Sequence, residues 1–286
     1  MPDVTCKLSG LEKSFGRNHV LRGIDLELRA GEVTALMGAN GAGKSTLVKV
    51  LCGYHFADAG EIELAGAPFK PLDAADAISK GVVTVHQSID DGVIPDLDVA
   101  TNLTLDLLTE PGADFFVNDR KLRRQARKVA ESMGLTMDVR TRVADLEVAD
   151  RQMIAIARAM ARAPKLLILD EPTSSLSASE ADRLFALIDR LRAEGVAILY
   201  ISHRMSDIRR VADRIVSMRD GAISGLFETE PLDYVGAVNA MLGHQMTEVD
   251  IDPVAGGEPI LEVDGVRLHE NGPQIDLTAR EGEVVA

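Results

Sequence analysis

The chain has 286 residues, of which 46% are hydrophobic and 27% are charged, and its formal net charge is −14. This balance predicts a folded chain with room for one large domain or one and a half, and excludes disorder as the default. The negative charge argues against nonspecific binding to nucleic acid or anionic membranes, which needs basic surface, but it permits ATP binding at a local phosphate site.

The cysteines and the N-terminus indicate an intracellular chain. Cys6 and Cys52 lack CxxC spacing and are interpreted as reduced thiols. The first ten residues lack the apolar core of a signal peptide. No apolar run approaches the roughly 18 residues of a spanning helix, so we expect a chain that does not cross a membrane by itself.

Short runs rich in Val, Ile and Leu alternate with amphipathic stretches, which predicts an α/β fold with a largely parallel sheet. Residues 32–38, 165–170 and 196–202 are predicted to be buried strands. A helix is predicted after Ser177, because Ser177 and Glu180 have the spacing of a capping box.

Helical patterns dominate residues 98–163, which predicts a helical subdomain inserted into the α/β core. The basic run from Arg120 to Lys128 has two interpretations, an anion patch or a solvated helix face, and the alternation with acidic and amide residues favours the second. Residues 247–258, acidic with Pro and Gly, are predicted to be a linker.

A phosphate-binding loop is predicted from "GANGAGKS", which fits G-x-x-x-x-G-K-[ST] between a predicted strand and a predicted helix. Small residues let backbone N–H groups surround phosphates, and the helix N-terminus adds its positive dipole end. The alternative is a glycine-rich structural turn. The predicted ATP-binding residues are Gly38, Ala39, Asn40, Gly41, Ala42, Gly43, Lys44, Ser45 and Thr46, with Lys44 reaching the phosphates and Ser45 ligating Mg²⁺.

The run "LLILDEP" predicts a buried strand with two carboxylates at its C-terminal end, where α/β proteins place ligands. Asp170 is placed to hold Mg²⁺, and Glu171 to polarise an attacking water. The other interpretation is that this acidic pair caps a helix.

Taken in order, these motifs resemble the ATP-binding subunits of ABC transporters. The resemblance implies an ABC ATPase domain over residues 1–246, with a P-loop NTPase (RecA-like) core, an N-terminal antiparallel β subdomain and the inserted helical subdomain. It implies that Phe15 stacks on adenine, although Phe15 alone would be interpreted as a core residue. Gln87, in "VTVHQSIDD", resembles the glutamine that touches Mg²⁺ and the membrane partner, and His203, in "YISHRMSDI", resembles the histidine that contacts the γ-phosphate. The remaining histidines are interpreted as structural: His19, His55, His86, His244 and His269.

Finer details resemble the branch of importers for ribose, xylose, galactose and related solutes, in which one polypeptide carries two ATPase domains. Residues 275–286 match residues 24–35 at eight of twelve positions. We therefore expect residues 259–286 to be the truncated start of a second ABC ATPase domain. The alternative is a tail that merely resembles the N-terminus.

One motif departs from the family. Where the resemblance expects L-S-G-G-Q, the chain has Leu146-Glu147-Val148-Ala149-Asp150. A carboxylate at 147 beside a phosphate ~4 Å away would cost about 4 kcal/mol at an effective dielectric near 20. Val148 would block the close approach that glycine permits. Ser177 stands where the family commonly has an aspartate, so we expect a weakened partner interface.

The resemblance implies an ATP-hydrolysing importer subunit for a sugar or similar polar solute, with ATP and Mg²⁺ as cofactors. Because its own signature motif departs from the family and the second domain is truncated, we expect the chain alone to be weakly active. Glu171, His203, Gln87 and Lys44 would be catalytic, and Ser45, Gln87 and Asp170 would serve the metal. The expected partners are permease subunits, a solute-binding protein indirectly, and a second ATPase domain in cis or in a homodimer, at the cytoplasmic face of the membrane. The alternatives are a soluble ABC ATPase acting on DNA or ribosomes, and a non-catalytic nucleotide-binding module.

Overall fold

The computed structural model describes residues 3–85, 92–105, 119–243, 257–267 and 274–281. The chain divides into two units, Met1–His244 and Gln245–Ala286, and each is described by itself. Gln87 and most of the predicted linker lie outside the described residues.

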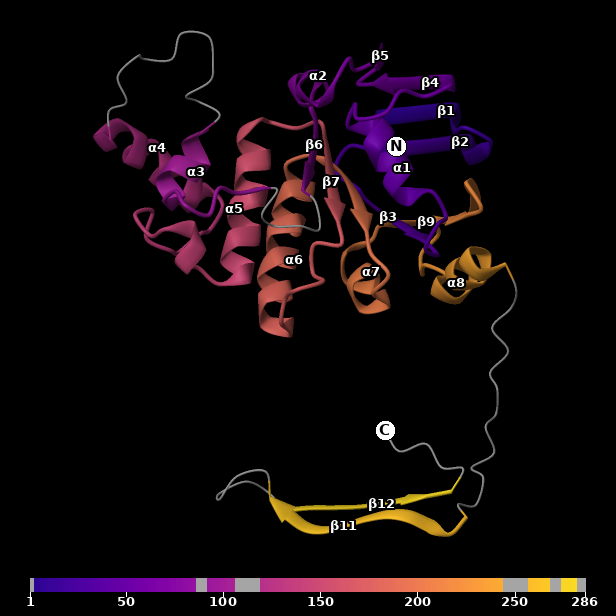
Figure 1. The fold of residues 1–286 in the computed structure, drawn as a ribbon. Helices are drawn as coiled ribbons and strands as arrows, with labels where there is room; N and C mark the ends of the chain where they lie inside the picture. The colour runs from indigo at the N-terminus through magenta and orange to yellow at the C-terminus, as the bar shows by residue number, and fades with distance from the viewer. Residues whose placement is uncertain (1–2, 86–91, 106–118, 244–256, 268–273, 282–286) are drawn as a thin grey trace. The chain divides into compact units, whose positions relative to one another are not determined.

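The first unit contains strands and helices in alternation (Figure 1). Its strands are β1 (Val4–Phe15), β2 (Asn18–Arg29), β3 (Val33–Gly38), β4 (Ala59–Leu64), β5 (Ala67–Pro68), β6 (Val82–Val85), β7 (Leu166–Asp170), β8 (Ala197–Ile201), β9 (Arg214–Arg219) and β10 (Ala222–Phe227). Its helices are α1 (Lys44–Leu51), α2 (Ala74–Lys80), α3 (Val99–Thr104), α4 (Asp119–Ser132), α5 (Val148–Ala161), α6 (Ala178–Ala193), α7 (Met205–Val211) and α8 (Tyr234–Leu242), with a short 3-10 turn, η3 (Val143–Asp145).

The strands form two sheets. A six-stranded sheet has the order β10-β9-β3-β8-β7-β6 and is parallel except for the antiparallel β9–β10 pair. A four-stranded antiparallel sheet has the order β2-β1-β4-β5. The predicted α/β class with a largely parallel sheet and an N-terminal antiparallel part is confirmed. Because β3, β8 and β7 are parallel neighbours, their carboxyl ends lie at one edge of the sheet, where the ligand site of such a sheet forms.

Strand alternation sends side chains into cores on both faces of the large sheet. Along β7, Leu167 and Leu169 pack with α5 and α6, whereas Leu166 and Ile168 pack with α1 and the antiparallel sheet. All four are fully buried, which explains why the strand reads as a continuous apolar run. Figure 1 shows α5 and α6 beside β6 and β7.

Helices α3, α4 and α5 pack together in the region predicted to be helical. In α4, Leu122, Ala126 and Ala130 are buried at four-residue spacing, whereas the charged side chains of the basic run are mostly exposed. The fully buried Asn102 joins α3 to the loop before it, because its Oδ1 accepts from Ile94 N (2.7 Å) and its Nδ2 donates to Ile94 O (3.0 Å).

The second unit contains one described hairpin, β11 (Pro259–Arg267) and β12 (Gln274–Arg280), paired antiparallel. Its register pairs Val263 with Leu277 and changes before Val266. Several of its apolar side chains are exposed: Ile260, Leu261, Val266 and Leu277.

Among the helices of the described ranges, none combines the length and the apolar character that a membrane span requires.

Candidate nucleotide-binding site

The predicted phosphate loop follows β3 and opens α1, as the motif requires. Gly41 and Gly43 have φ values of +82° and +103°, which side chains with a Cβ rarely adopt. A Cβ at Gly38 would lie 2.8 Å from Met218 O, and one at Gly43 would lie 3.1 Å from Val20 O. Glycine is therefore required for conformation and for close approach of neighbouring backbone, so the loop forms a cradle that larger residues would fill.

Lys44, the first residue of α1, folds back over this loop. Its Nζ donates to Gly38 O (2.5 Å) and Ala39 O (3.2 Å). Partial burial lowers the pKa of the Lys44 ammonium, while the negative charges of Glu171 and Asp170 act in the opposite direction. The ammonium thus lies within the field of the acidic pair and is held by carbonyls that an anion could replace.

The other loop residues present both backbone and hydroxyl groups. Ala39, Asn40, Gly41 and Ser45 are exposed, Thr46 is half-buried, and Ala42 and Gly43 are buried. No acidic side chain lies in the first turn of α1. The positive end of the helix dipole is therefore not neutralised locally, which suits a phosphate group.

The acidic pair stands at the C-terminal end of β7. Asp170 ends the strand, and Glu171 follows it with φ +51°, a left-handed conformation that costs a non-glycine residue on the order of 1 kcal/mol or more. Its amide N–H donates to Ile201 O (2.9 Å) at the end of β8. The bond fixes Glu171 against the neighbouring strand.

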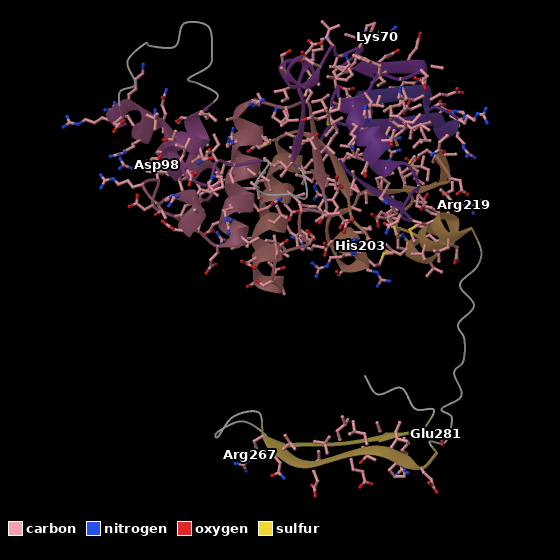
Figure 2. The ribbon with its side chains drawn as sticks, viewed as in Figure 1. Lys70, Asp98, His203, Arg219, Arg267 and Glu281 are labelled. Carbon is pink, nitrogen blue, oxygen red and sulfur yellow. The ribbon has the colours of Figure 1, made fainter. Side chains whose placement is uncertain are left out.

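Glu171 and His203 are in direct contact. Nδ1 of His203 lies 2.9 Å from Oε1 of Glu171 and equally close to its Oε2. The histidine side chain is 75% exposed and that of Glu171 only 14%, and Figure 2 shows His203 near the start of α7. Oε2 of Glu171 is buried, and its contact with Nδ1 of His203 does not have the geometry of a hydrogen bond. The histidine therefore sits against both carboxylate oxygens.

Phe15 lies at the end of the β1–β2 hairpin and is 45% exposed. Its ring meets that of His55 at 71° with centroids 5.1 Å apart, and Lys13 Nζ lies 5.4 Å from its centroid. Asp58 ties the loop after α1 to the end of β1, because it accepts hydrogen bonds from Lys13 Nζ (2.7 Å) and Ser14 N (2.6 Å). Phe15 is therefore a fixed, solvent-accessible ring rather than a core residue.

The sequence interpretation grouped His55 with the structural histidines and did not foresee its ring contact with Phe15. Tyr54, His55 and Phe56 place three rings in succession in a chain that is only 3% aromatic, but this run does not indicate Phe15 as the partner of His55. Tyr54 and Phe56 are 59% and 63% exposed.

The donor set fits Mg²⁺ held together with a nucleotide. The described residues contain no group of three or more His, Cys, Asp or Glu that could hold a metal by itself. Ser45 and Asp170 instead supply one hydroxyl and one carboxylate, and Mg²⁺ commonly completes its shell with phosphate oxygens and water. The glycine cradle at Gly38 and Gly43 has the form that phosphates would need.

Glu147, in the departing motif, is the exposed N-cap residue of α5, and its side chain makes no capping hydrogen bond. An open hollow lies beside it, lined by Val148, Arg151, Ser175, Ser177, Ser179 and Glu180 as well. Ser177 is engaged within its own helix, because its N–H donates to Oε2 of Glu180 (2.6 Å). Nothing at this helix end resembles the glycine cradle around Lys44.

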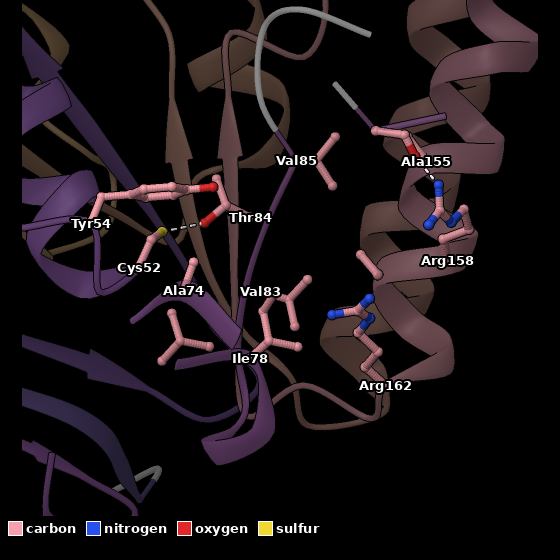
Figure 3. A pocket seen from close by; sticks show the side chains of 13 residues that line it. Cys52, Tyr54, Ala74, Ile78, Val83, Thr84, Val85, Ala155, Arg158 and Arg162 are labelled. Carbon is pink, nitrogen blue, oxygen red and sulfur yellow. Dashed lines mark hydrogen bonds between the residues drawn. The ribbon is translucent and has the colours of Figure 1, made fainter. Parts of the chain in front are cut away.

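A separate groove of about 190 Å³ lies between β6, α2 and α5 (Figure 3). Its floor is mostly apolar, with Ile78, Val83 and Val85, and Arg158 and Arg162 border it. Arg158 donates to Gly92 O (2.6 Å). Cys52 also lines the groove and contacts Oγ1 of Thr84 (Sγ to Oγ1, 2.6 Å), and burial raises the pKa of its thiol to about 11.

The geometry defines a class of protein. Three features together define the site of a P-loop nucleotide-binding cassette. They are a strand–glycine loop–helix with a lysine over it, an acidic pair on a parallel strand two positions away, and a histidine bonded to the glutamate of that pair.

The sequence model described as ABC transporter matches residues 21–174, and the chain belongs to this family. It is 38% identical over 280 residues to the ribose import ATP-binding protein RbsA 2 of Rubrobacter xylanophilus, covering 98% of this chain and 54% of that protein. It is 39% identical over 289 residues to the protein of the same name from Burkholderia cenocepacia, covering 99% and 56%. The chain spans about half the length of these curated relatives.

Solved structures show the same fold. A nucleotide-free ATP-binding cassette from an ABC transporter has a TM-score of 0.72 at 23% identity, covering 84% of this chain and 96% of that one. The ADP conformation of another such cassette has a TM-score of 0.72 at 22% identity, covering 85% and 100%.

Proposed function

We propose that this chain is the ATP-binding and ATP-hydrolysing part of an ABC importer for ribose or a similar small polar solute. One observation carries the proposal: Glu171 and His203 lie 2.9 Å apart where β7 and β8 end, and the Lys44 ammonium, after β3, lies within the electrostatic field of Glu171. The relatives named as ribose import proteins support the solute class.

Each residue of the site has a distinct chemical role. Mg²⁺ would be held by Ser45 and Asp170, and when bound it supplies positive charge to the phosphates. Lys44 exchanges its carbonyl partners for phosphate oxygens. Glu171 accepts a hydrogen bond from a water molecule through its carboxylate and orients it for in-line attack. His203 fixes the carboxylate and reaches toward the terminal phosphate.

The remaining loop residues serve the nucleotide, and Thr46 follows Ser45 in the first turn of α1. Phe15 offers its exposed ring to adenine, steadied by His55. Gln87 belongs to the proposal as the residue that links the metal to the membrane partner.

The proposed domains are an ATPase domain at residues 1–246, a linker at 247–258 and the first strands of a second ATPase domain at 259–286. The support is the repeated sequence and a shared bulge. In both hairpins a glycine with positive φ, Gly10 or Gly265, donates its N–H to an aspartate at the matching position, Asp25 or Asp276. That second domain, in cis or in a homodimer, would complete the site.

The groove of Figure 3 is proposed to receive a segment of a membrane permease at the cytoplasmic face of the membrane. Its apolar side chains, its two bordering arginines and the exposed ring of Tyr54 suit an amphipathic helix with an acidic residue. A solute-binding protein would act on the far side of that permease. A soluble ATPase acting on nucleic acid is disfavoured by the charge of −14.

The test is titration of the chain with Mg·ATP. Lys44→Ala should weaken the Kd by about tenfold or more, since it removes a charged phosphate contact. Lys49→Ala, an exposed lysine at the other end of the same helix, is the matched control and should leave the Kd unchanged. Failure of the parent chain to bind Mg·ATP, or equal loss in both variants, would remove the basis of the proposal.

A further inference from the structure

A buried carboxylate lies behind the Glu171–His203 pair. Asp207, in α7, is 3% exposed, and it is surrounded by the fully buried side chains of Thr173 and Tyr200. Oδ2 accepts from the hydroxyls of Thr173 and Tyr200 (3.3 Å from the latter), and Oδ1 accepts from Ser206 (3.1 Å). Hydroxyl donors therefore satisfy both oxygens, as burial of a charge requires.

This cluster joins the two loops that carry the site. Thr173 lies two residues after Glu171, and Asp207 lies four residues after His203. Arg204 adds a second link, because its guanidinium donates to Thr173 O (2.9 Å). The two loops are thus held together on the buried side by the Thr173–Asp207 bond and on the exposed side by the Glu171–His203 contact.

The arrangement has a mechanical consequence. His203 is 75% exposed, so little packing fixes its side chain. Its position depends on the backbone between Ser202 and α7, which Ser202 holds by accepting from Arg204 N (3.0 Å) and which Asp207 ties to the loop after β7. Without the Thr173–Asp207 bond, the Arg204–Thr173 and Glu171–Ile201 bonds would keep the two loops adjacent, but the position of His203 relative to Glu171 could change.

We propose that Asp207 is a positioning residue that, through Thr173, sets the distance between Glu171 and His203. The expected effects on kcat rest on the proposed function, because they require that the chain hydrolyses ATP. The hydrogen-bond partners described for its carboxylate are Thr173, Tyr200 and Ser206, so we expect Asp207 to act through other residues.

The decisive variant is Thr173→Val, which keeps the shape and removes the donor to Asp207. It should lower kcat for ATP by roughly 10- to 100-fold, since small misplacements of catalytic groups have effects of that size. The Kd for Mg·ATP should stay within about twofold, because Lys44 and its loop are untouched. Thr173→Ser, which restores the hydroxyl, should recover kcat. Tyr200→Phe removes the other donor, and should lower kcat less because Tyr200 lies in β8 itself.

Ser217→Ala is the matched control. Ser217 is also fully buried, and its hydroxyl donates to Ala237 O (2.7 Å), away from the site. Its loss should reduce stability but leave kcat unchanged. An equal fall of kcat in Ser217→Ala and Thr173→Val would overturn the inference, as would an unchanged kcat in Thr173→Val.

A second readout does not depend on turnover. The imidazole Cε1–H resonance of His203, assigned by its absence in His203→Gln, should move in Thr173→Val and stay in place in Ser217→Ala and Thr173→Ser. If the parent chain neither binds nor hydrolyses ATP, the proposed function fails while this resonance still tests the positioning role. A His203 signal that is the same in Thr173→Val as in the parent would refute it.

Discussion

The two hairpins, β1–β2 and β11–β12, share sequence and backbone but differ in burial. In the first, Leu8 pairs with Leu26 and the register changes before Leu11; in the second, Val263 pairs with Leu277 and the register changes before Val266. The bulge carries the same glycine-to-aspartate bond, 2.8 Å in one and 2.6 Å in the other. Yet Leu26 is 6% exposed and Leu277 is 38% exposed.

The difference separates what is local from what is not. Strand pairing, register and bulge follow from the repeated residues themselves, because an aspartate can bond a bulge amide within one hairpin. Burial follows from distant elements, since β1 also pairs with β4 and the face of the hairpin packs on α1. A nucleotide site needs both the local hairpin and the distant elements that pack on it. Among the described residues, a phosphate loop follows only the first hairpin.

The largest expected effect tests the proposal that ATP hydrolysis takes place in the first unit. Glu171→Gln keeps shape but removes the charge that polarises water, so turnover should fall by about 10²–10⁴-fold while Mg·ATP binding persists. ATPase assays measure turnover and nucleotide titration measures binding. Glu194→Gln, at an exposed glutamate, is the control. Turnover within twofold of the parent would mean that the chemistry lies elsewhere.

The next effect compares the same leucine in each hairpin. Leu26→Ala leaves a cavity in a packed core and should lower the free energy of unfolding of the first unit by about 2–5 kcal/mol. Leu277→Ala should change stability by less than ~0.5 kcal/mol, because Leu277 is already partly exposed. Urea unfolding of the chain measures both, and equal losses would contradict the difference in burial.

A smaller effect concerns the shared bulge. Asp25→Ala and Asp276→Ala each remove one hydrogen bond to a glycine amide, so each should cost about 1 kcal/mol locally. Hydrogen exchange at the amides of Gly10 and Gly265 reports the two sites separately. We expect faster exchange at the matching amide only. Loss of protection in both hairpins from one substitution would show that the bulges are not independent.

The sequence was sufficient where chemistry follows from contiguous residues. The glycine loop, Lys44 and the acidic pair are such cases, since strand, loop and helix are adjacent in the chain. The family resemblance added His203. The packing of His55 on Phe15 and of Asp207 on Thr173 was not foreseen, because those pairs meet only after β1, α1, β7 and α7 have packed. No local pattern encodes such contacts.

The smallest expected effect concerns Glu147 and the different roles of the two proposed ATPase domains. We propose that two ATPase domains pair head to tail, so that the N-terminus of α5 serves the site of the other domain and not the site that contains Lys44. Glu147 is exposed and makes no capping bond, so Glu147→Ser removes no contact from the first unit's own site. A serine can cap α5, which should raise stability by about 0.5–1 kcal/mol. Turnover should change by less than about threefold, whereas loss of the corresponding motif in the second domain should remove nearly all of it.

Both variants would be compared in the full-length protein with its permease, by ATPase rate and thermal unfolding. A tenfold gain in rate from Glu147→Ser, or an unchanged rate after loss of the second motif, would place the hydrolytic site in the other ATPase domain. Only a site completed by α5 could respond to a carboxylate at 147.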